Sequence, residues 1–302
     1  MIHTFDELLH AAARTGTQRA LVVSPANHDT FEAIRDARRR LGLEFILTGD
    51  RHVIETALPE RDGIEIVDRP EIADSLTAAM DLLARGEAGI LMKGSVDTAT
   101  LLKAALKPES GLRTGRLLSD VFLFEYAPRP ANKLVMITDG GLNIAPDLAA
   151  KVQLIHNAVQ VAHALGNANP KVAVLSASEF VQQNMPSSTD AALLAQMNVR
   201  GEIEGCVVAG PLALDNALVA RAAREKGIVS EVAGAAEILI CPNIESANML
   251  AKATTYIGNA RLAHVIVGAR IPILIPSRAD QSDAKLLSLA LGMIMKIHKE
   301  NS

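Results

Sequence analysis

Short apolar runs alternate with amphipathic stretches along almost the whole chain, and this alternation restricts the fold more than any other feature. The runs are rich in Val, Ile and Leu and have the length of buried β-strands. They are ALVVS, EFILT, IEIVD, GILMKG, DVFLF, KLVMIT, KVAVLS, GCVVAG, EILICP, HVIVG and PILIP. The segments between them, such as HDTFEAIRDARRRLG, repeat apolar residues at the period of a helix with one buried face. Strands that alternate with helices form a parallel or mixed sheet covered by helices, so we predict an α/β fold.

The chain has 302 residues, of which 49% are hydrophobic, and is long enough for two domains. The Pro-marked segment APRPANK and the turn-rich segment DGGLNIAPD separate its two sets of strands. The last strand, PILIP, and the helix after it are expected to return to the first domain. We therefore predict a first domain of residues 1–140 plus 273–302 and a second domain of residues 141–272.

Composition argues against two classes of partner. A net charge of −4, the lack of Trp and the presence of only two Tyr disfavour a nucleic-acid surface, which needs basic side chains and often stacking rings. Gly, Pro or a charged residue interrupts every apolar run before it reaches the length of a membrane span. The N-terminal segment MIHTFDELLHAAART carries acidic residues and lacks the pattern of a secretory signal. We expect a cytoplasmic protein that binds small molecules.

Cys206 and Cys241 each lie inside an apolar run, without a CxxC spacing or a neighbouring His cluster. Structural zinc needs such spacing, and the eight His residues do not supply it, so no metal is predicted. We predict that both cysteines pack as small buried hydrophobic residues, as free Cys commonly does. A covalent acyl-cysteine intermediate is the alternative.

The segment IPILIPSRADQSDAKLLSLAL runs from an apolar strand into a helix through Ser277, Arg278, Asp280 and Asp283. A hydroxyl, a guanidinium and carboxylates at a helix N-terminus suit an anion that is held beside a proton acceptor. The same residues also suit a purely structural role, because Ser277 and Asp280 are common capping types and Asp283 favours the first turn of a helix.

Polar residues directly follow three other strands, in CPNIESANMLAK, VAGPLALDNALVARAAREKGI and ITDGGLNIAPDL. We predict that these strand ends form one cleft for an anionic, phosphate-bearing ligand. In MKGSVDTATLLKAAL, Lys93 and Ser95 lie where a strand turns into a helix, and backbone amides there can meet phosphate. A surface turn with an ordinary cap is the alternative, because the chain has neither GxxxxGK[ST] nor GxGxxG after a strand.

Five blocks, taken together and in order, carry a resemblance to a known family. They are MKGSVDTATLLKAAL, GLRTGRLLSDVFLFE, GPLALDNALVARAAREKGI, VAGAAEILICPNIESANMLAK and IVGARIPILIPSRADQSDAKLLSLAL. This ordered set spans nearly the whole chain and resembles the phosphate acetyl/butyryltransferase family. The LALDNA and SRAD blocks are more similar to the butyryltransferase branch than to the acetyltransferase branch.

The resemblance implies reversible transfer of a short acyl group between coenzyme A and inorganic phosphate. It implies a fold similar to the isocitrate/isopropylmalate dehydrogenases, with two three-layer αβα domains, a cleft between them and assembly as a homodimer. Coenzyme A is then a substrate, and no cofactor is bound permanently. In this family a carboxylate is thought to remove the thiol proton of coenzyme A, since the thiolate is the competent nucleophile.

Matched to the family residue by residue, Ser277 and Arg278 correspond to its SR pair, which steadies the phosphate and the charge on the carbonyl oxygen. The resemblance implies Asp283 as the base. Asp280 is the second candidate for that role and is also counted among the substrate-binding residues.

The remaining candidates are assigned to substrate binding. Arg113 and Arg116, in GLRTGRLLSD, are expected to bind coenzyme A phosphates, with a solvated loop as the alternative. Asn143 and Asn248 can donate to an acyl oxygen or a phosphate, with turn capping and a helix-surface amide as their alternatives.

The chain also departs from the family pattern near Asn248 and Lys252. The family commonly has Gly at the position of Ala247 and an aromatic residue at Ala251. These differences leave the acyl-chain preference open, between acetyl, butyryl and similar groups, while Lys252 is kept as a substrate-binding candidate.

Two other functions remain as alternatives. A metal-dependent dehydrogenase on the related fold would need a convergent cluster of aspartates, which the sequence does not display. A catalytically silent coenzyme A-binding protein is the second, although Ser277, Arg278 and Asp283 are all present.

Overall fold

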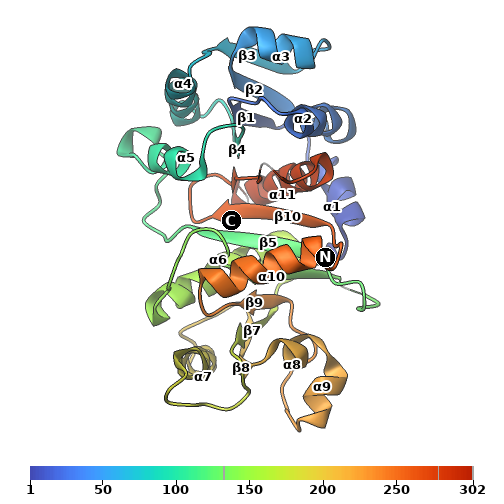
Figure 1. The fold of residues 1–302 in the computed structure, drawn as a ribbon, viewed down its shortest axis with the longest axis vertical. Coiled ribbons are helices and arrows are strands. Elements are labelled where there is room, and N and C mark those ends of the chain that lie inside the picture. The colour runs from blue at the N-terminus through green and yellow to red at the C-terminus, as the bar shows by residue number, and fades with distance from the viewer. Residues whose placement is uncertain (132, 278, 301–302) are drawn as a thin grey trace. The chain divides into compact units, whose positions relative to one another are not determined.

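A computed structural model of the chain describes residues 1–131, 133–277 and 279–300. Each of the apolar runs predicted to be a strand forms one, and Figure 1 labels most of them. The strands are β1 (Arg19–Val23), β2 (Glu44–Gly49), β3 (Ile64–Asp68), β4 (Ile90–Lys93), β5 (Ser119–Glu125), β6 (Leu134–Thr138), β7 (Lys171–Leu175), β8 (Val207–Leu212), β9 (Ile238–Ile240), β10 (Leu262–Val267) and β11 (Ile273–Leu274).

Helices separate most of these strands, which confirms the predicted α/β class. They are α1 (Phe5–Ala12), α2 (His28–Leu41), α3 (Arg51–Ala57), α4 (Ile72–Ala84), α5 (Thr98–Ala105), α6 (Leu148–Ala164), α7 (Pro186–Val199), α8 (Leu214–Leu218), α9 (Ala220–Glu225), α10 (Ile244–Tyr256) and α11 (Ser282–Glu300), with a short 3₁₀ helix, η1, at Pro108–Ser110. None of the helices in the described part of the chain is long and apolar enough to cross a membrane.

The chain divides into two compact units, at other positions than those predicted. The first unit comprises Phe5–Arg116 and Arg261–Ser302, and the second comprises Met1–Thr4 and Leu117–Ala260. The segment APRPANK, which suggested a boundary, is the connection between β5 and β6, and these strands form an antiparallel pair within the second unit. A Pro-rich turn inside a hairpin and a linker between domains look alike in sequence.

In the first unit the strand order is β3-β2-β1-β4-β11-β10. Neighbouring strands are parallel except for β10, which runs antiparallel to β11. Helices α1, α2 and α11 pack on one another, and α4 packs with α5 on the other side of the strands (Figure 1). Helix α2 is well defined at both ends, because Asn27 accepts a hydrogen bond from the backbone of Thr30 and Gly42 ends the helix at a φ of 66°.

In the second unit the strand order is β5-β6-β9-β7-β8, with β5 antiparallel to β6 and the other neighbours parallel. Helices α6 and α7 pack on one face of this sheet. On the other face, apolar side chains of β6, β7 and β9 form a core with residues of α8 and α10. Successive side chains of a strand point to opposite faces and both faces are covered, so these strands are apolar except for Thr138 at the end of β6 and Lys171 at the start of β7.

The segment NALVARAAREKG does not form one continuous helix. Helix α8 ends at Leu218 and α9 begins at Ala220, with Val219 in an extended conformation. A β-branched residue tolerates this conformation well. The backbone of Gly234 packs so closely against Ala220 that a Cβ atom added at Gly234 would lie 2.4 Å from the Ala220 Cα atom.

Candidate active site

Parallel strands β1, β4 and β11 end at the same edge of the first unit, because Val23 lies opposite Lys93 and Leu274 lies opposite Met92. We call this the carboxyl edge of the first unit. Lys93 is the last residue of β4, Ser95 follows β4, and Ser277 follows β11. The structure therefore brings these three predicted site residues to one edge of one sheet, where ligands of open α/β sheets commonly bind.

The loop after β4 is held tightly against the end of β1. The amides of Gly94 and Ser95 donate to the carbonyl oxygens of Val23 and Ser24, over 2.9 and 2.8 Å. A Cβ atom at Gly94 would lie 2.3 Å from the Val23 oxygen, so only glycine fits. Both amides are therefore used within the protein, and the side chains of Lys93 and Ser95 are the remaining candidates for a phosphate contact.

Ser24 has a left-handed backbone conformation, with a φ of 49°, at the end of β1. Its hydroxyl donates to Ser75 Oγ over 2.8 Å, and Ser75 donates in turn to Thr48. All three side chains are buried. A non-glycine residue with positive φ is uncommon, and this hydrogen-bonded chain holds it at the strand end beside Gly94.

Asp280 organises the turn that follows β11. Its Oδ2 atom accepts a hydrogen bond from the backbone of Ser277 over 2.7 Å, and the Ser277 hydroxyl oxygen accepts one from Ala279 over 3.3 Å. The Nε2 atom of His264, a buried residue of β10, lies 3.9 Å from the same Asp280 oxygen. We use the name SRAD turn for the described residues Ser277, Ala279 and Asp280. Arg278, predicted to be catalytic, lies outside the described residues.

Asp283, the base that the family resemblance implied, forms an ion pair. Both of its carboxylate oxygens accept hydrogen bonds from Arg261, from Nε over 3.1 Å and from a terminal nitrogen over 3.3 Å. Arg261 also donates to Asp6 of α1 over 3.0 Å. Arg261 therefore binds the carboxylate of Asp283 in a bidentate ion pair, a geometry that suits a guanidinium. Asp280, by contrast, lies within the SRAD turn.

Lys285 is a residue that sequence reasoning missed. It lies in the first part of α11 with only 1% of its surface exposed, and its ammonium group donates to the Asp280 carbonyl oxygen. Burial lowers the pKa of Lys285, although the charges of Asp280 and Asp29 oppose this shift. The signal in the sequence was a lysine at an apolar position of DAKLLSLAL, where a long basic side chain is expected only if it has partners.

Arg113 and Arg116 belong to the opposite, amino edge of the first unit. Their segment is tied to the turn between β10 and β11, since the Arg270 amide donates to Leu112 and the Thr114 hydroxyl donates to Gly268. The charge of Arg116 also acts on Lys299, at the end of α11. A cavity of about 520 Å³ at this edge is lined by Gln18, Arg19, Arg270, Lys296 and Lys299, among others.

Asp139, which directly follows β6, is the centre of a turn in the second unit. Its Oδ1 atom accepts hydrogen bonds from the amides of Gly141 and Leu142, over 2.8 and 3.0 Å, and its Oδ2 atom accepts one from Asn143. Asn143 also donates to the Leu118 carbonyl oxygen over 2.8 Å. Sequence reasoning selected Asn143 from ITDGGLN but missed Asp139, although the same strand end presents both.

The predicted amide donors both make hydrogen bonds within the protein. Asn248 on α10 donates its amide to the Gly140 carbonyl oxygen over 2.9 Å, as Asn143 does to Asp139 and Leu118. Within the described residues, the side-chain oxygen of Asn143 receives no hydrogen bond in the structure and remains a possible acceptor for a ligand. Lys252 is exposed on α10, and its ammonium group lies 5.9 Å from the centre of the Tyr256 ring.

Both cysteines are buried and free of disulfides, which confirms their predicted packing role. Burial raises the pKa of Cys206 to about 11 and that of Cys241 to about 12. A thiol with such a pKa holds its proton at neutral pH and is a poor nucleophile. The geometry therefore disfavours the alternative of an acyl-cysteine intermediate.

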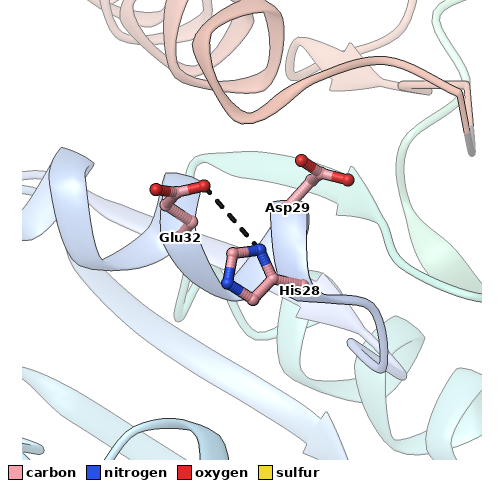
Figure 2. Close-up of side chains that lie close together, drawn as sticks. All are labelled: His28, Asp29 and Glu32. Atoms are coloured by element: carbon pink, nitrogen blue, oxygen red, sulfur yellow. Dashed lines mark ion pairs between the residues drawn. The ribbon is translucent and has the colours of Figure 1, made fainter.

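One cluster among the described residues has metal-ligand types within reach of one another: His28, Asp29 and Glu32 on α2 (Figure 2). His28 and Glu32 are one helical turn apart, with His28 Nδ1 3.8 Å from the Glu32 carboxylate and the His28 side chain largely exposed. Such i,i+4 pairs are common on helix surfaces. This cluster does not supply the buried aspartates that a metal-dependent dehydrogenase would need.

A family model and curated relatives identify the same family for this chain. The model of the family described as phosphate acetyl/butaryl transferase matches residues 56–293. The chain is 39% identical to a phosphate butyryltransferase of Clostridium acetobutylicum, over 99% of this chain and 100% of that protein. It is 41% identical to a phosphate acetyltransferase of Thermotoga maritima, over 96% and 99% of the two chains.

A solved structure agrees with these relatives. The branched-chain phosphotransacylase from Enterococcus faecalis V583 superposes with a TM-score of 0.81 at 32% sequence identity, over 92% of this chain and 99% of that one. Family model, relatives and solved fold all cover most of the chain, as the five sequence blocks do. The chain belongs to the phosphate acetyl/butyryltransferase family.

Proposed function

We propose that this protein transfers a short acyl group between coenzyme A and inorganic phosphate, by direct attack within a ternary complex. The observation that carries the proposal is the carboxyl edge of the first unit, where Lys93, Ser95 and the SRAD turn lie at adjoining strand ends. Membership of the family supplies the reaction, because the residue types alone point only to an anion beside a carboxylate.

Phosphate is bound, in this proposal, by the side chains that follow β4 and β11. The Lys93 ammonium group, the hydroxyls of Ser95 and Ser277 and the guanidinium of Arg278 are all donors, and charge-assisted hydrogen bonds to phosphate are strong. Ser277 and Arg278 also stabilise the negative charge that develops on the thioester carbonyl oxygen. The buried position of Lys93 strengthens such contacts, because less water screens them.

A carboxylate removes the thiol proton when coenzyme A is the attacking group. The geometry favours Asp280 for this role, since its side chain lies in the SRAD turn beside His264, whereas both oxygens of Asp283 are already bound to Arg261. Asp283, which the family resemblance implied, remains the competing candidate.

Coenzyme A is bound, in this proposal, by residues of both units. Arg113 and Arg116 would bind its phosphates, and the cationic side chains around the cavity at the amino edge support an anionic group there. Asn143 would accept a hydrogen bond from an amide of the pantetheine arm, because its own N–H groups are used within the protein. Asn248 and Lys252 of α10 would line the acyl or coenzyme A site.

The proposed function also favours a particular arrangement of the fold. A two-domain arrangement like that of the isocitrate/isopropylmalate dehydrogenases, with a cleft between the domains, would give the ternary complex a site shielded from water. A cytoplasmic location is supported by the two free, buried cysteines, since disulfides are rare in reducing compartments.

Acyl transfer is tested by phosphate-dependent release of coenzyme A from acetyl, propionyl, butyryl and longer thioesters. We expect phosphate-dependent release from at least one short thioester. The rate of release should be highest at one chain length and lower for shorter and longer acyl groups. The relatives are named both butyryl- and acetyltransferases at similar identity, so the series also decides specificity. Release at background level from every thioester, in folded protein, would reject the proposal.

A homodimer is also proposed, through the face of the second unit beside β8. This strand is at the edge of its unit's sheet, and a groove of about 620 Å³ runs along it. Val199 and Val229 line the groove and are 87% and 101% exposed. Native proteins rarely leave a sheet edge beside exposed apolar residues uncovered.

Replacing Val229 with Asp is expected to shift the protein from about twice its 32.0 kDa chain mass to the monomer mass, because a charge there must be desolvated on association. Light scattering coupled to size-exclusion chromatography measures this. Ile257→Asp is the matched control, since Ile257 is also exposed but lies after α10. A dimer that survives Val229→Asp and dissociates with Ile257→Asp would place the interface elsewhere.

A further inference from the structure

Two carboxyl groups are buried side by side in the second unit. Asp139 follows β6 and Asp120 lies near the start of β5, and these strands are antiparallel, so the two ends meet. The two residues are 2% and 1% exposed. A Cβ atom added at Gly141 would lie 2.5 Å from the Asp120 Oδ2 atom, so the carboxyl group of Asp120 packs directly against the turn that Asp139 begins.

The hydrogen bonds of Asp139 are those of an ionised carboxylate. It accepts from the amides of Gly141 and Leu142 on one oxygen and from the Asn143 side chain on the other. A protonated carboxyl carries a donor on one oxygen and accepts fewer bonds. The observed turn therefore depends on the charge of Asp139.

The turn is also fixed from outside. Asn143 donates to the Leu118 carbonyl oxygen, just before β5, and Asn248 on α10 donates to the Gly140 carbonyl oxygen. A side chain at Gly140 would displace its neighbours, because a Cβ atom there would lie 3.2 Å from the Phe122 ring. With these supports in place, the orientation of Asn143 is set by Asp139 on one side and Leu118 on the other.

The surroundings of Asp139 oppose the charge that the turn needs. Burial raises its pKa to about 6, the charge of Asp120 adds to this rise, and the hydrogen bonds from Gly141, Asn143 and Leu142 counteract it. Asp120 on β5 is the charged residue of the described chain that acts on Asp139 in this way. The named neighbours from the turn and from α10 are uncharged.

We propose that Asp139 is a positioning residue, whose ionised carboxylate holds Asn143 and the 140–142 backbone in the form used for acyl transfer, and that its burial beside Asp120 makes this turn sensitive to acid. This inference rests on the function proposed above, in which Asn143 contacts coenzyme A. On protonation of Asp139, the Asn143 amide faces an oxygen that no longer accepts its hydrogen bond, and the side chain is released.

The test compares the pH dependence of turnover in the wild-type protein with that in three variants, at saturating acyl-CoA and phosphate between pH 5 and pH 8. Wild-type turnover is expected to fall as the pH drops through about 6. Asp139→Asn should lower turnover by up to roughly 100-fold at neutral pH, because a shifted Asn143 misplaces the substrate, and it should lack that acidic limb. Asp120→Asn should move the limb to lower pH, because the neighbouring negative charge is removed.

Glu204→Gln is the matched control, because Glu204 is an exposed carboxylate of the same unit. Its pH profile should match that of the wild type. If wild-type protein and Asp139→Asn share one acidic limb, or if Asp120→Asn leaves the limb in place, the positioning role is refuted.

A second measurement does not depend on activity. The pKa of Asp139 is higher in the folded protein than its ordinary value of 3.8, so the folded state takes up a proton as the pH falls through about 6 and is stabilised by it. The melting temperature of the wild type should therefore rise relative to that of Asp139→Asn between pH 7.5 and pH 5. If the relative shift in melting temperature is observed but the protein transfers no acyl group, the proposed function is wrong. The titration of Asp139 in the folded protein is still supported in that case. A constant difference in melting temperature overturns the inference itself.

Discussion

Asp280→Asn is expected to lower turnover by about 100-fold near neutral pH, a typical loss for a positioned general base. The amide keeps the shape of the carboxylate but cannot take the thiol proton. The affinity for coenzyme A should change little, because the substitution removes proton transfer rather than a binding contact. The loss should shrink as the pH rises toward the thiol pKa of about 8.5, since solvent then supplies thiolate.

Asp283→Asn is the matched variant in this test, and it should retain most of the turnover. Its expected effect is a modest loss of stability, because Arg261 loses one of its two carboxylate partners. Steady-state turnover from acyl phosphate and coenzyme A, with coenzyme A binding measured separately, distinguishes the two variants. If Asp283→Asn is the impaired one, the base is the residue that the family resemblance implied. If neither is impaired, the general-base mechanism does not apply to this protein.

Arg278→Lys is expected to lower the ratio of kcat to KM for phosphate by about 100-fold, even though the positive charge is kept. A guanidinium binds phosphate through two parallel N–H groups, and an ammonium group cannot reproduce that planar geometry. Loss of one donor to a developing negative charge has an effect of this order. Initial rates across a range of phosphate concentrations measure it.

Arg40→Lys provides the control for that change. Arg40 lies in the last turn of α2, within the first unit, and is exposed. Its substitution should leave the phosphate dependence as in the wild type. A lysine variant at 278 with wild-type kcat and KM for phosphate would remove Arg278 from the site.

The sequence was sufficient to predict the strands of this fold because buried parallel strands are apolar on both faces. KLVMIT and EILICP, for example, stand out from their amphipathic neighbours and became β6 and β9. The unit boundaries were harder to predict. They depend on which strands pair, and the hairpin of β5 and β6 is formed by a Pro-rich segment that resembles a linker.

The site was only partly predictable for a related reason. Lys93, Ser95 and Ser277 lie at one edge because β4 and β11 are parallel, which the pattern of strands and helices implied. Arg113 and Arg116 lie at the other edge because their segment follows α5 and binds the turn before β11, a contact between residues far apart in sequence.

Ion pairs and buried charges were outside the reach of local patterns. The contacts of Arg261 with Asp283 and Asp6 join three separate segments of the chain. The pairing of Asp139 with Asp120 likewise depends on the register of β5 and β6, although both acids were visible in the sequence beside apolar runs. Such contacts decide which carboxylate is available for chemistry.

The central claim is that the acyl group passes from coenzyme A to phosphate and nowhere else. Phosphorus NMR of a reaction that contains acyl-CoA, phosphate and wild-type protein, with thiol release followed in parallel, tests it most directly. The account predicts one acyl phosphate formed for each coenzyme A released, and no release when phosphate is left out. Release of coenzyme A without acyl phosphate would identify a thioesterase and contradict the account.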